Sequence, residues 1–382
     1  SSEMSLKNRL NFLYIILIAI LPLSNVFAAG KNSSELKNDD KKSHEKEFDV
    51  SEMIMHHIKD AHEWHLWGPE HGGTAVYLPI ILLDNGLKTF SSKNFYDGIS
   101  KTTVDKITNA SVDYLIGVGP AAEYAMFHEK IYKLNNGELT FEDGHVHGSI
   151  KPWDFSITKN VLSLFFGATL ILVIMFSVAK FYKRNGAVAP KGLAKFLEPL
   201  VVFVRDDIAK ANIADGKHTK YLPYLLTIFF FILFNNFLGL IPILPGGANL
   251  TGNITVTLFL SVCTLIITLA SSNKNYWKHI FATPGVPIAL LPIMIPIEMV
   301  GIFTKPFALM IRLFANMTAG HIIILALISI IFINQNAAWG ALSVPMALFI
   351  SVLELLVAFL QAYLFAMLSA LFIGAALEEA HH

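Results

Sequence analysis

Charged side chains are distributed very unevenly along this 382-residue chain, and the distribution limits the folds open to it. The chain has 29 basic and 29 acidic residues, but only eight of these 58 fall in residues 222–382. The eight are Lys274, Lys278, Glu298, Lys305, Arg312, Glu354, Glu378 and Glu379. This excludes a single soluble globule, a disordered chain and a nucleic-acid binder. It predicts a polar N-terminal part followed by a multi-pass membrane part.

The first 30 residues have the pattern of a secretory signal peptide. Lys7 and Arg9 precede a short apolar stretch, Leu10–Leu23, and small residues follow up to Gly30. A first membrane anchor is the alternative, but the apolar stretch is short for a membrane span. Residues 31–50 are rich in Lys, Asp and Glu, and we expect them to form a flexible charged linker.

Residues 51–150 mix polar and apolar side chains and predict a small α+β domain outside the membrane. The run Asn135-Asn136-Gly137 is typical of a tight hairpin turn. The expected elements are a helix at Ser51–Leu66, strands at Val76–Leu83 and Phe90–Phe95, and a hairpin of Tyr124–Leu134 with Glu138–Phe141.

Histidines are concentrated in the same region. If Ser51–Leu66 is helical, the spacing of His62 and His65 would let both bind one metal ion. However, the single cysteine, Cys263, lies far away in an apolar run, and the histidine spacing matches no standard metal-binding pattern. We therefore expect no metal site and no cofactor. A surface or interface helix is the preferred interpretation, with proton buffering as an alternative role.

Five apolar segments after residue 151 are long enough to cross a membrane. They are Phe155–Tyr182, Leu222–Leu244, Ile254–Ala270, about 288–334 and about 339–377. Residues 180–221 contain nine Lys or Arg against four acidic residues, which indicates the cytoplasmic side. Residues 51–150 are then extracytoplasmic and the C-terminus is cytoplasmic. Apolar residues recurring at helical spacing from Leu193 to Ile208 predict an amphipathic helix in the membrane interface.

The last two apolar segments are too long to cross a membrane once. About 40 residues of helix extend over about 60 Å, against a hydrocarbon thickness of about 30 Å. We expect these helices to tilt strongly or to kink, with Pro292, Pro296 and Pro306 as kink positions in the first. Only the polar run 334–336 separates the two segments, so the sequence predicts a long, tilted helical hairpin.

Arg312 is the most unusual residue of the membrane part. Arginine stays charged at any working pH, and holding it in lipid costs at least about 2.5 kcal/mol. A snorkelling residue near a helix end is the alternative, but Arg312 lies in the middle of its segment. Glu298 and Lys305 precede it at intervals of seven residues and Asn316 follows after four, so all four share one helix face.

The second long segment carries Glu354 and Gln361, which are also seven residues apart. In an antiparallel hairpin that turns near Asn336, Arg312 lies opposite Gln361 and His321 lies opposite Glu354. Chance placement of a few polar residues is the alternative. Since His and Glu can exchange protons and Arg cannot, the arrangement is typical of ion conduction past a fixed charge.

The ten residues from Arg312 to His321, RLFANMTAGH, closely resemble the signature of subunit a of F-type ATP synthases. Glu298, Lys305-Pro306 and the run Leu360-Gln361-Ala362-Tyr363 resemble the same family. The resemblance covers about residues 155–382 and says little about residues 31–150. Residues 151–382 are therefore expected to form a membrane ion-channel domain of the subunit a type.

This resemblance implies a non-catalytic stator subunit of a bacterial inner membrane, with the c-ring and the peripheral-stalk b subunits as partners. In the family, two offset half-channels carry protons to and from the carboxylates of the c-ring. The residue matching Arg312 faces those carboxylates and blocks a direct leak. The positions of His321 and Glu354 line a proton path, and in some relatives the two residue types are exchanged.

The resemblance also assigns further polar residues to the path. Asn316 and Gln361 match polar positions near the arginine, and Glu298 matches an acid near the cytoplasmic half-channel. Asn235, Asn236 and Lys305 are possible channel-lining residues. A proton is the expected ion because His and Glu carry protons, and sodium is the alternative because the choice depends on the ligands of the ring.

Two other classes of protein fit less well. A secondary transporter would have an inverted repeat, and no second half of the chain matches residues 288–377. An exported binding module with a membrane anchor would not need five apolar segments with buried charge. The chain also lacks a Gly-rich phosphate-binding loop, so we expect it to bind neither nucleotide nor nucleic acid.

Overall fold

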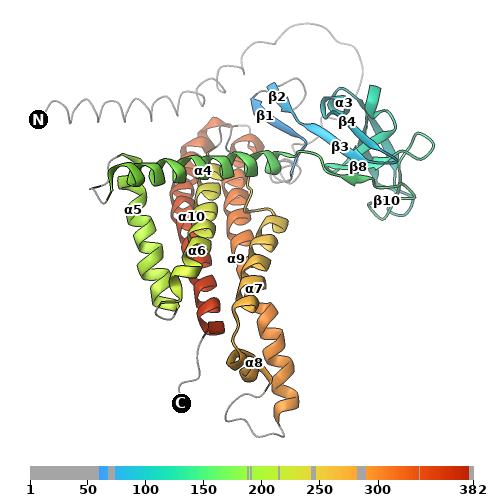
Figure 1. Cartoon of the computed structure of the whole chain (residues 1–382). Coiled ribbons are helices and arrows are strands. Elements are labelled where there is room, and N and C mark those ends of the chain that lie inside the picture. Colours follow the sequence, from blue (N-terminus) through green and yellow to red (C-terminus); the bar gives the residue numbers. More distant parts are fainter. Residues whose placement is uncertain are drawn as a thin grey trace, which may run out of the picture. The chain divides into compact units, whose positions relative to one another are not determined.

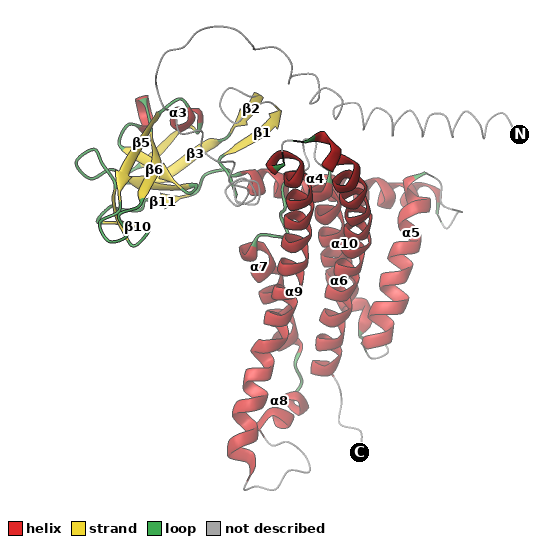
Figure 2. Cartoon of the chain, turned by 180° about the vertical axis from the view of Figure 1, so that it is seen from behind, coloured by secondary structure: helices red, strands yellow, loops and turns green. Residues whose placement is uncertain are grey.

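The computed structural model describes residues 60–67, 74–186, 189, 192–213, 216–241, 247–281, 290–334 and 336–377. The predicted leader, the predicted linker and residues 51–59 of the predicted first helix lie outside these ranges. Within them, the strands fall between residues 63 and 154 and the long helices between residues 159 and 377, as the colouring of Figure 2 shows.

The described part of the N-terminal region forms four small antiparallel sheets. One sheet pairs β1 (Glu63–Trp67) with β2 (Thr74–Tyr77), and a second has β3 (Pro79–Leu83) between β11 (Trp153–Asp154) and β4 (Leu87–Ser91). The largest is β5 (Ile99–Val104), β6 (Ser111–Ile116), β7 (Tyr124–Phe127) and β8 (Lys130–Lys133) in that order. The last pairs β9 (Thr140–Glu142) with β10 (His145–His147).

Buried and less buried side chains alternate along β3, which shows how this region forms a hydrophobic core. Ile80 and Leu82 are fully buried while their neighbours along the strand are not, which is the period-two pattern of a sheet with one covered face. They pack with Phe95 of the short helix α3 (Lys93–Tyr96) and with Tyr124 of β7. The hydrophobic core therefore joins two of the sheets.

The predicted helix Ser51–Leu66 is wrong over the residues of it that the structure describes. Residues 63–66 of the predicted helix Ser51–Leu66 belong to β1, since aromatic side chains such as Trp64 favour a paired strand. The predicted strand Phe90–Phe95 ends at Ser91, and the chain turns into α3. Apart from α3 and the 3-10 turn η1 (Gly119–Ala121), the described residues from 60 to 157 contain no helix.

Hairpin turns in this region are tighter than the sequence suggested. The expected single strand Tyr124–Leu134 is itself a hairpin of β7 and β8, because His128 and Glu129 take positive φ angles of 48° and 62°. The expected turn at Asn135-Asn136-Gly137 is confirmed, with an isolated bridge between Asn135 and Glu138. Asn136 and Gly137 both have positive φ there, as a type I′ turn requires.

The helical part confirms the five predicted apolar segments, drawn from green to red in Figure 1. They are α4 (Lys159–Asn185), α6 (His218–Leu240), α7 (Ile254–Ser271), α9 (Leu291–Ile333) and α10 (Gly340–Leu377), each long and apolar enough to cross a membrane. A shorter helix, α8 (Lys274–Phe281), follows α7.

The predicted helical hairpin is confirmed. α9 has 43 residues and α10 has 38, and only the 3-10 turn η4 (Ala337–Trp339) and the residues beside it separate them. α9 remains one helix across Pro296 and Pro306. α6, α9 and α10 lie side by side in both whole-chain views, and α4 runs across them. The tilt of the hairpin in a membrane stays a prediction.

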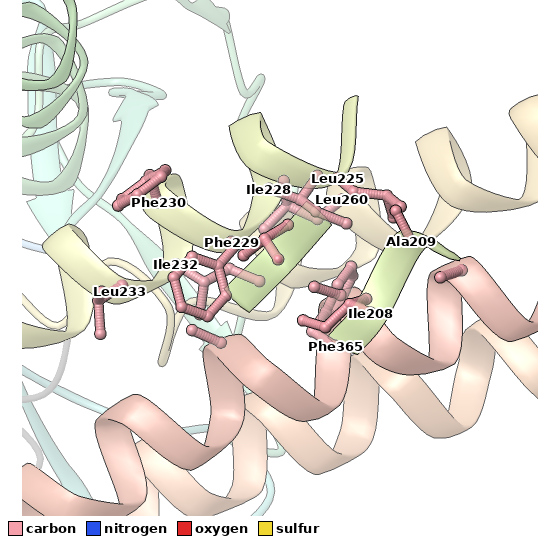
Figure 3. Packing of buried hydrophobic residues seen from close by; sticks show 14 of the residues in the cluster. Ile208, Ala209, Leu225, Ile228, Phe229, Phe230, Ile232, Leu233, Leu260 and Phe365 are labelled. Carbon is pink, nitrogen blue, oxygen red and sulfur yellow. The ribbon is translucent and has the colours of Figure 1, made fainter. Parts of the chain in front are cut away.

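The predicted amphipathic helix is also present. It begins as α5 (Leu193–Phe203) and continues as the π-helix η2 (Val204–Lys210). Leu197, Val204 and Ile208 are buried in the main core, where Figure 3 shows Ile208 beside Phe365 of α10 and near α6. Part of its apolar side therefore packs against helices, whereas Phe196 is exposed. Its place in the membrane interface stays a prediction.

Small residues set the distance between α10 and its neighbours. Ala358, Ala362, Ala366 and Ala370 are fully buried at every fourth position of α10. Small residues at this spacing allow two helices to approach closely. One turn further on, Gly374 lies directly against the backbone carbonyl of Asn212, where a Cβ atom would collide with it.

Candidate functional site

Arg312 lies on a side of α9 that the rest of the described chain leaves exposed. Lys305 and Asn316 are exposed as well, and so are large apolar residues beside them such as Phe307 and Ile311. The predicted partner Gln361 is buried on α10 and 3% exposed. In the described part of the chain no hydrogen bond joins Arg312 to Gln361, so the guanidinium is available to groups outside the helix bundle.

Glu354 is buried where α10 faces α9. A Cβ atom built on Gly320 would overlap its Oε1 and would lie 2.6 Å from its Cδ, so the carboxyl group rests on the backbone of Gly320. Gly320 immediately precedes His321, which confirms the predicted register of the hairpin at this level. His321 Nε2 and both carboxyl oxygens of Glu354 have no hydrogen-bond partner among the described residues, and the predicted meeting of the two side chains stays a prediction.

Asn235 and Asn236, in the middle of α6, are both buried but have different surroundings. Asn236 donates from Nδ2 to the carbonyl of Ala358 at 3.1 Å and accepts from Thr251 Oγ1 at 2.6 Å. Asn235 donates to the carbonyl of Phe231 at 2.7 Å, while its Oδ1 lies against Gly167 of α4. Asn236 thus links α6 to α10 and to the loop before α7. Asn235 lies where α4 crosses α6.

Several buried polar atoms in this region have no hydrogen-bond partner among the described residues. They are Asn235 Oδ1, His321 Nε2 and both carboxyl oxygens of Glu354. Buried polar atoms in folded proteins are nearly always paired, with protein or with ordered water. These atoms lie at different helix contacts: Asn235 Oδ1 is against α4, the Glu354 carboxyl is against α9, and His321 Nε2 is near Gly239 of α6. Each is a suitable position for a bound water.

The loop before α7 closes this region on one side. Asn249 donates from Nδ2 to the carbonyl of Met317 at 3.4 Å, and Thr318 Oγ1 donates to the carbonyl of Gly252 at 3.4 Å. Both α9 residues belong to the run from Arg312 to His321. The loop therefore holds this run in place beside Glu354 and Asn236.

A second polar group lies toward the beginning of α9. The ammonium of Lys305 is 5.7 Å from the centre of the Phe372 ring. Burial raises the pKa of Tyr276 on α8, and the electrostatic effect of the Glu298 carboxylate raises it further. Lys305 and Tyr276 also line a small cavity with Thr264 and Thr268. Arg312 thus separates two polar groups along α9.

The sequence analysis missed a row of hydroxyl side chains on α7. Thr257, Ser261, Thr264 and Thr268 are all buried. Thr264 Oγ1 is 2.8 Å from the hydroxyl of Tyr224 on α6 and 3.2 Å from Ser369 Oγ on α10. The spacing of four, three and four residues is the signal that would have revealed this face of the helix.

A separate polar cluster lies in the strand-rich region. His62 is 2% exposed, with Nδ1 at 3.3 Å from Glu129 Oε2 and Nε2 at 3.7 Å from Asp154 Oδ2. Burial lowers the pKa of His62, but the interactions with the carboxylates of Asp154 and Glu129 outweigh it and raise the pKa to about 9. His62 is therefore an imidazolium held by two carboxylates. The described residues contain no group of three side chains able to hold a metal ion, and the side chain of His65 lies outside them.

Comparison with known proteins gives two family matches along the chain. Residues 161–374 match the family described as ATP synthase A chain, and residues 53–155 match a domain of unknown function. ATP synthase subunit a of Pelodictyon phaeoclathratiforme is 45% identical over 325 residues, which cover 81% of this chain and 92% of the relative.

Two further relatives agree with these matches. ATP synthase subunit a 2 of Prosthecochloris aestuarii is 44% identical over 319 residues, or 81% of this chain and 93% of the relative. ATP synthase subunit a 2 of Chlorobaculum tepidum is 52% identical over 254 residues, or 64% of this chain and 70% of the relative. The helical part, with Arg312 between its two polar groups, lies inside the matched region, and the chain belongs to the ATP synthase A chain family.

Proposed function

We propose that this chain is the proton-translocating stator subunit of an ATP synthase membrane sector, without a catalytic site of its own. In this proposal, two offset half-channels carry protons to and from the carboxylates of a rotating c-ring. The observation that carries it is the position of Arg312, exposed on α9 between two separate groups of polar side chains.

Arg312 interacts with the ring and not with its own chain. The exposed face around it combines one cation with large apolar side chains such as Phe307, which suits contact with another apolar helix that carries a single carboxylate. Arginine favours the ionised form of an approaching carboxylate, so a ring proton is released there. It also repels a proton that would pass straight from one half-channel to the other, because it cannot itself be deprotonated.

The first half-channel uses the unpaired polar atoms of α6, α9 and α10. His321 and Glu354 pass protons, since both groups can bind and release one, and Asn235 contributes its free oxygen. Asn236 holds α10 at the correct distance through its bond to the Ala358 carbonyl. We place this half-channel on the extracytoplasmic side, next to the loop at 247–253 and the hairpin turn.

The second half-channel opens toward the beginning of α9. Glu298 and Lys305 line it on the cytoplasmic side, where Lys274 and Lys278 also lie in this topology. Asn316 and Gln361 flank Arg312 and orient the groups that exchange protons with the ring. A proton is the proposed ion because the unpaired groups of the first half-channel are an imidazole and a carboxyl.

The remaining assignments follow from the same topology. The chain is a multi-pass protein of a bacterial inner membrane, with the domain at residues 51–150 outside the cytoplasm and the C-terminus inside. Its partners are the c-ring and the peripheral-stalk b subunits. Purification from native membranes should recover these subunits with the chain, and an isolated chain without a c-ring would overturn the assignment.

Replacing Arg312 provides the direct test. Arg312→Ala should abolish ATP synthesis driven by a proton gradient in membrane vesicles, while the complex still assembles. Arg205→Ala is the matched control, because Arg205 is an exposed arginine of η2 whose contact is with the adjacent Asp206. Gradient-driven synthesis by assembled Arg312→Ala complexes would contradict the proposed function.

A further inference from the structure

One hydroxyl group on the buried face of α7 differs from its neighbours. Thr257, Ser261 and Thr268 donate to backbone carbonyls of their own helix, at 2.8 to 3.3 Å. Such bonds pair the hydroxyl with the backbone of its own helix. Thr264 also contacts the Leu260 carbonyl, but it alone of the four is within hydrogen-bond distance of side-chain hydroxyls on two other helices.

These contacts form a line of three hydroxyls. Tyr224 on α6 is 2.8 Å from Thr264, and Thr264 is 3.2 Å from Ser369 on α10. Thr264 and Ser369 are fully buried. Each hydroxyl can donate one proton and accept another, so a line of hydroxyls can pass a proton in either direction without a net change in any member.

Thr264, the middle hydroxyl of the line, also lines a small cavity. The cavity has a volume of about 10 Å³, which is close to the minimum for one water molecule. Thr264, Thr268, Tyr276 and Lys305 supply polar atoms to its lining, enough to hold a water. The charge of Glu298, which lies about two turns before Lys305 on α9, acts on Tyr276.

The line of hydroxyls lies on the side of Arg312 that is nearer to the beginning of α9. The cavity contains Lys305, which precedes Arg312, whereas His321 and Gly320 follow it. The hydroxyls are therefore separate from the unpaired group around Glu354. They connect the interior of the helix bundle with the Glu298 end of α9.

We propose that Tyr224, Thr264 and Ser369, with one water in the adjacent cavity, form a hydroxyl relay that carries protons through the second half-channel. The inference rests on the proposed function and adds three positioning residues to it. Each transfer moves one proton onto a hydroxyl oxygen while the proton already there leaves toward the next oxygen. No oxidant, reductant or covalent intermediate takes part.

The test uses substitutions that remove single oxygen atoms. Thr264→Val and Tyr224→Phe each remove one hydroxyl and keep the shape of the side chain, whereas Thr264→Ser keeps the hydroxyl. Thr255→Val is the matched control, because Thr255 is on the exposed side of the same helix. The measurement is passive proton conduction through the assembled membrane sector in vesicles, normalised to the amount of complex.

We expect Thr264→Val and Tyr224→Phe to lower conduction about 10²-fold, the lower end of the typical contribution of a proton-transfer group. Thr264→Ser should conduct near the wild-type rate, and Thr255→Val should be unchanged. If Thr264→Val fails to assemble, Tyr224→Phe alone decides. Wild-type conduction in assembled Tyr224→Phe and Thr264→Val complexes would overturn the relay, as would an equal loss in Thr264→Val and Thr264→Ser. Neither result affects the proposed function, which is tested separately by Arg312→Ala and by purification with the c-ring.

Discussion

Gly320 offers a sensitive test of how closely the two long helices must fit around Glu354. A Cβ atom at this position would overlap the Oε1 atom of Glu354 and would come within 2.6 Å of Cδ and 3.0 Å of Cγ. Ordinary contacts of this kind begin near 3.4 Å. Gly320→Ala therefore forces the carboxyl group to move by roughly 1 Å or more, and a misplacement of about 1 Å can lower a rate about 10²-fold.

The fold should survive this substitution. The atoms displaced are at the end of a flexible side chain, and alanine favours a helix by about 1 kcal/mol over glycine. We therefore expect Gly320→Ala complexes to assemble normally but to conduct protons roughly 10²-fold more slowly in the vesicle assay. Gly301→Ala is the control, because a Cβ atom on Gly301 of the same helix meets nothing within 4 Å.

A second substitution separates displacement of Glu354 from other effects. Glu354→Asp shortens the side chain by one carbon, or about 1.5 Å, which is close to the displacement that alanine imposes. The double variant Gly320→Ala/Glu354→Asp should then conduct better than Gly320→Ala alone. Normal conduction by Gly320→Ala, or a double variant worse than both single variants, would refute the reasoning.

Two further predictions concern packing and charge elsewhere in the chain. Gly374→Ala brings a Cβ atom within 3.0 Å of the Asn212 carbonyl carbon, and only the backbone can move there to make room. The substitution should therefore lower the free energy of unfolding by about 1–3 kcal/mol. Thermal unfolding of the solubilised complex measures this loss, with Gly301→Ala as the control. The His62 pKa is raised from 6.5 to about 9, so its contribution of about 3 kcal/mol is complete below pH 6.5 and is lost as the pH rises through 9. Amide exchange of residues 60–64 and 153–158, corrected for intrinsic rates, should therefore accelerate from pH 6.5 to pH 9.5 in the wild type. If the ratio of the wild-type exchange rate to that of His62→Gln is the same at both pH values, this prediction is contradicted.

The membrane helices were the most predictable part of the fold. A lipid environment requires apolar side chains over the whole length of a helix, so the hydrophobic pattern alone located α4, α6, α7, α9 and α10 within a few residues. The hairpin register also followed from the sequence, since Gly320 meets Glu354 as the turn near Asn336 requires.

The strand-rich region was harder to predict because its strands are short and its turns depend on positive φ angles. Asn136-Gly137 could be recognised, since Gly favours such angles. His128 and Glu129 carry no such signal, and the turn between β7 and β8 was read as continuous strand. The pairing of β1 with β2 fixes Glu63–Trp67 as a strand, and long-range pairing of this kind is not visible in local periodicity.

The polar residues of the candidate site differ in how clearly the sequence points to them. Charged residues in an apolar segment attract notice because their burial is costly, which identified Arg312 and Glu354. Hydroxyl residues such as Thr264 are common in membrane helices, so only their contacts distinguish them. The close approach of Gly167 to Asn235 depends on the crossing of α4 over α6, which sequence spacing does not reveal.

The alanine row of α10 limits how this helix can move during proton transfer. Ala358, Ala362, Ala366 and Ala370 occupy a space that fits only a methyl group on each turn, while the opposite side presents exposed residues such as Leu356. Rotation of α10 about its own axis would force leucine-sized side chains into that space. This packing favours one rotational position of α10 beside α6. In the proposed function, each proton then advances by reorientation of side chains and water and not by rotation of the helix.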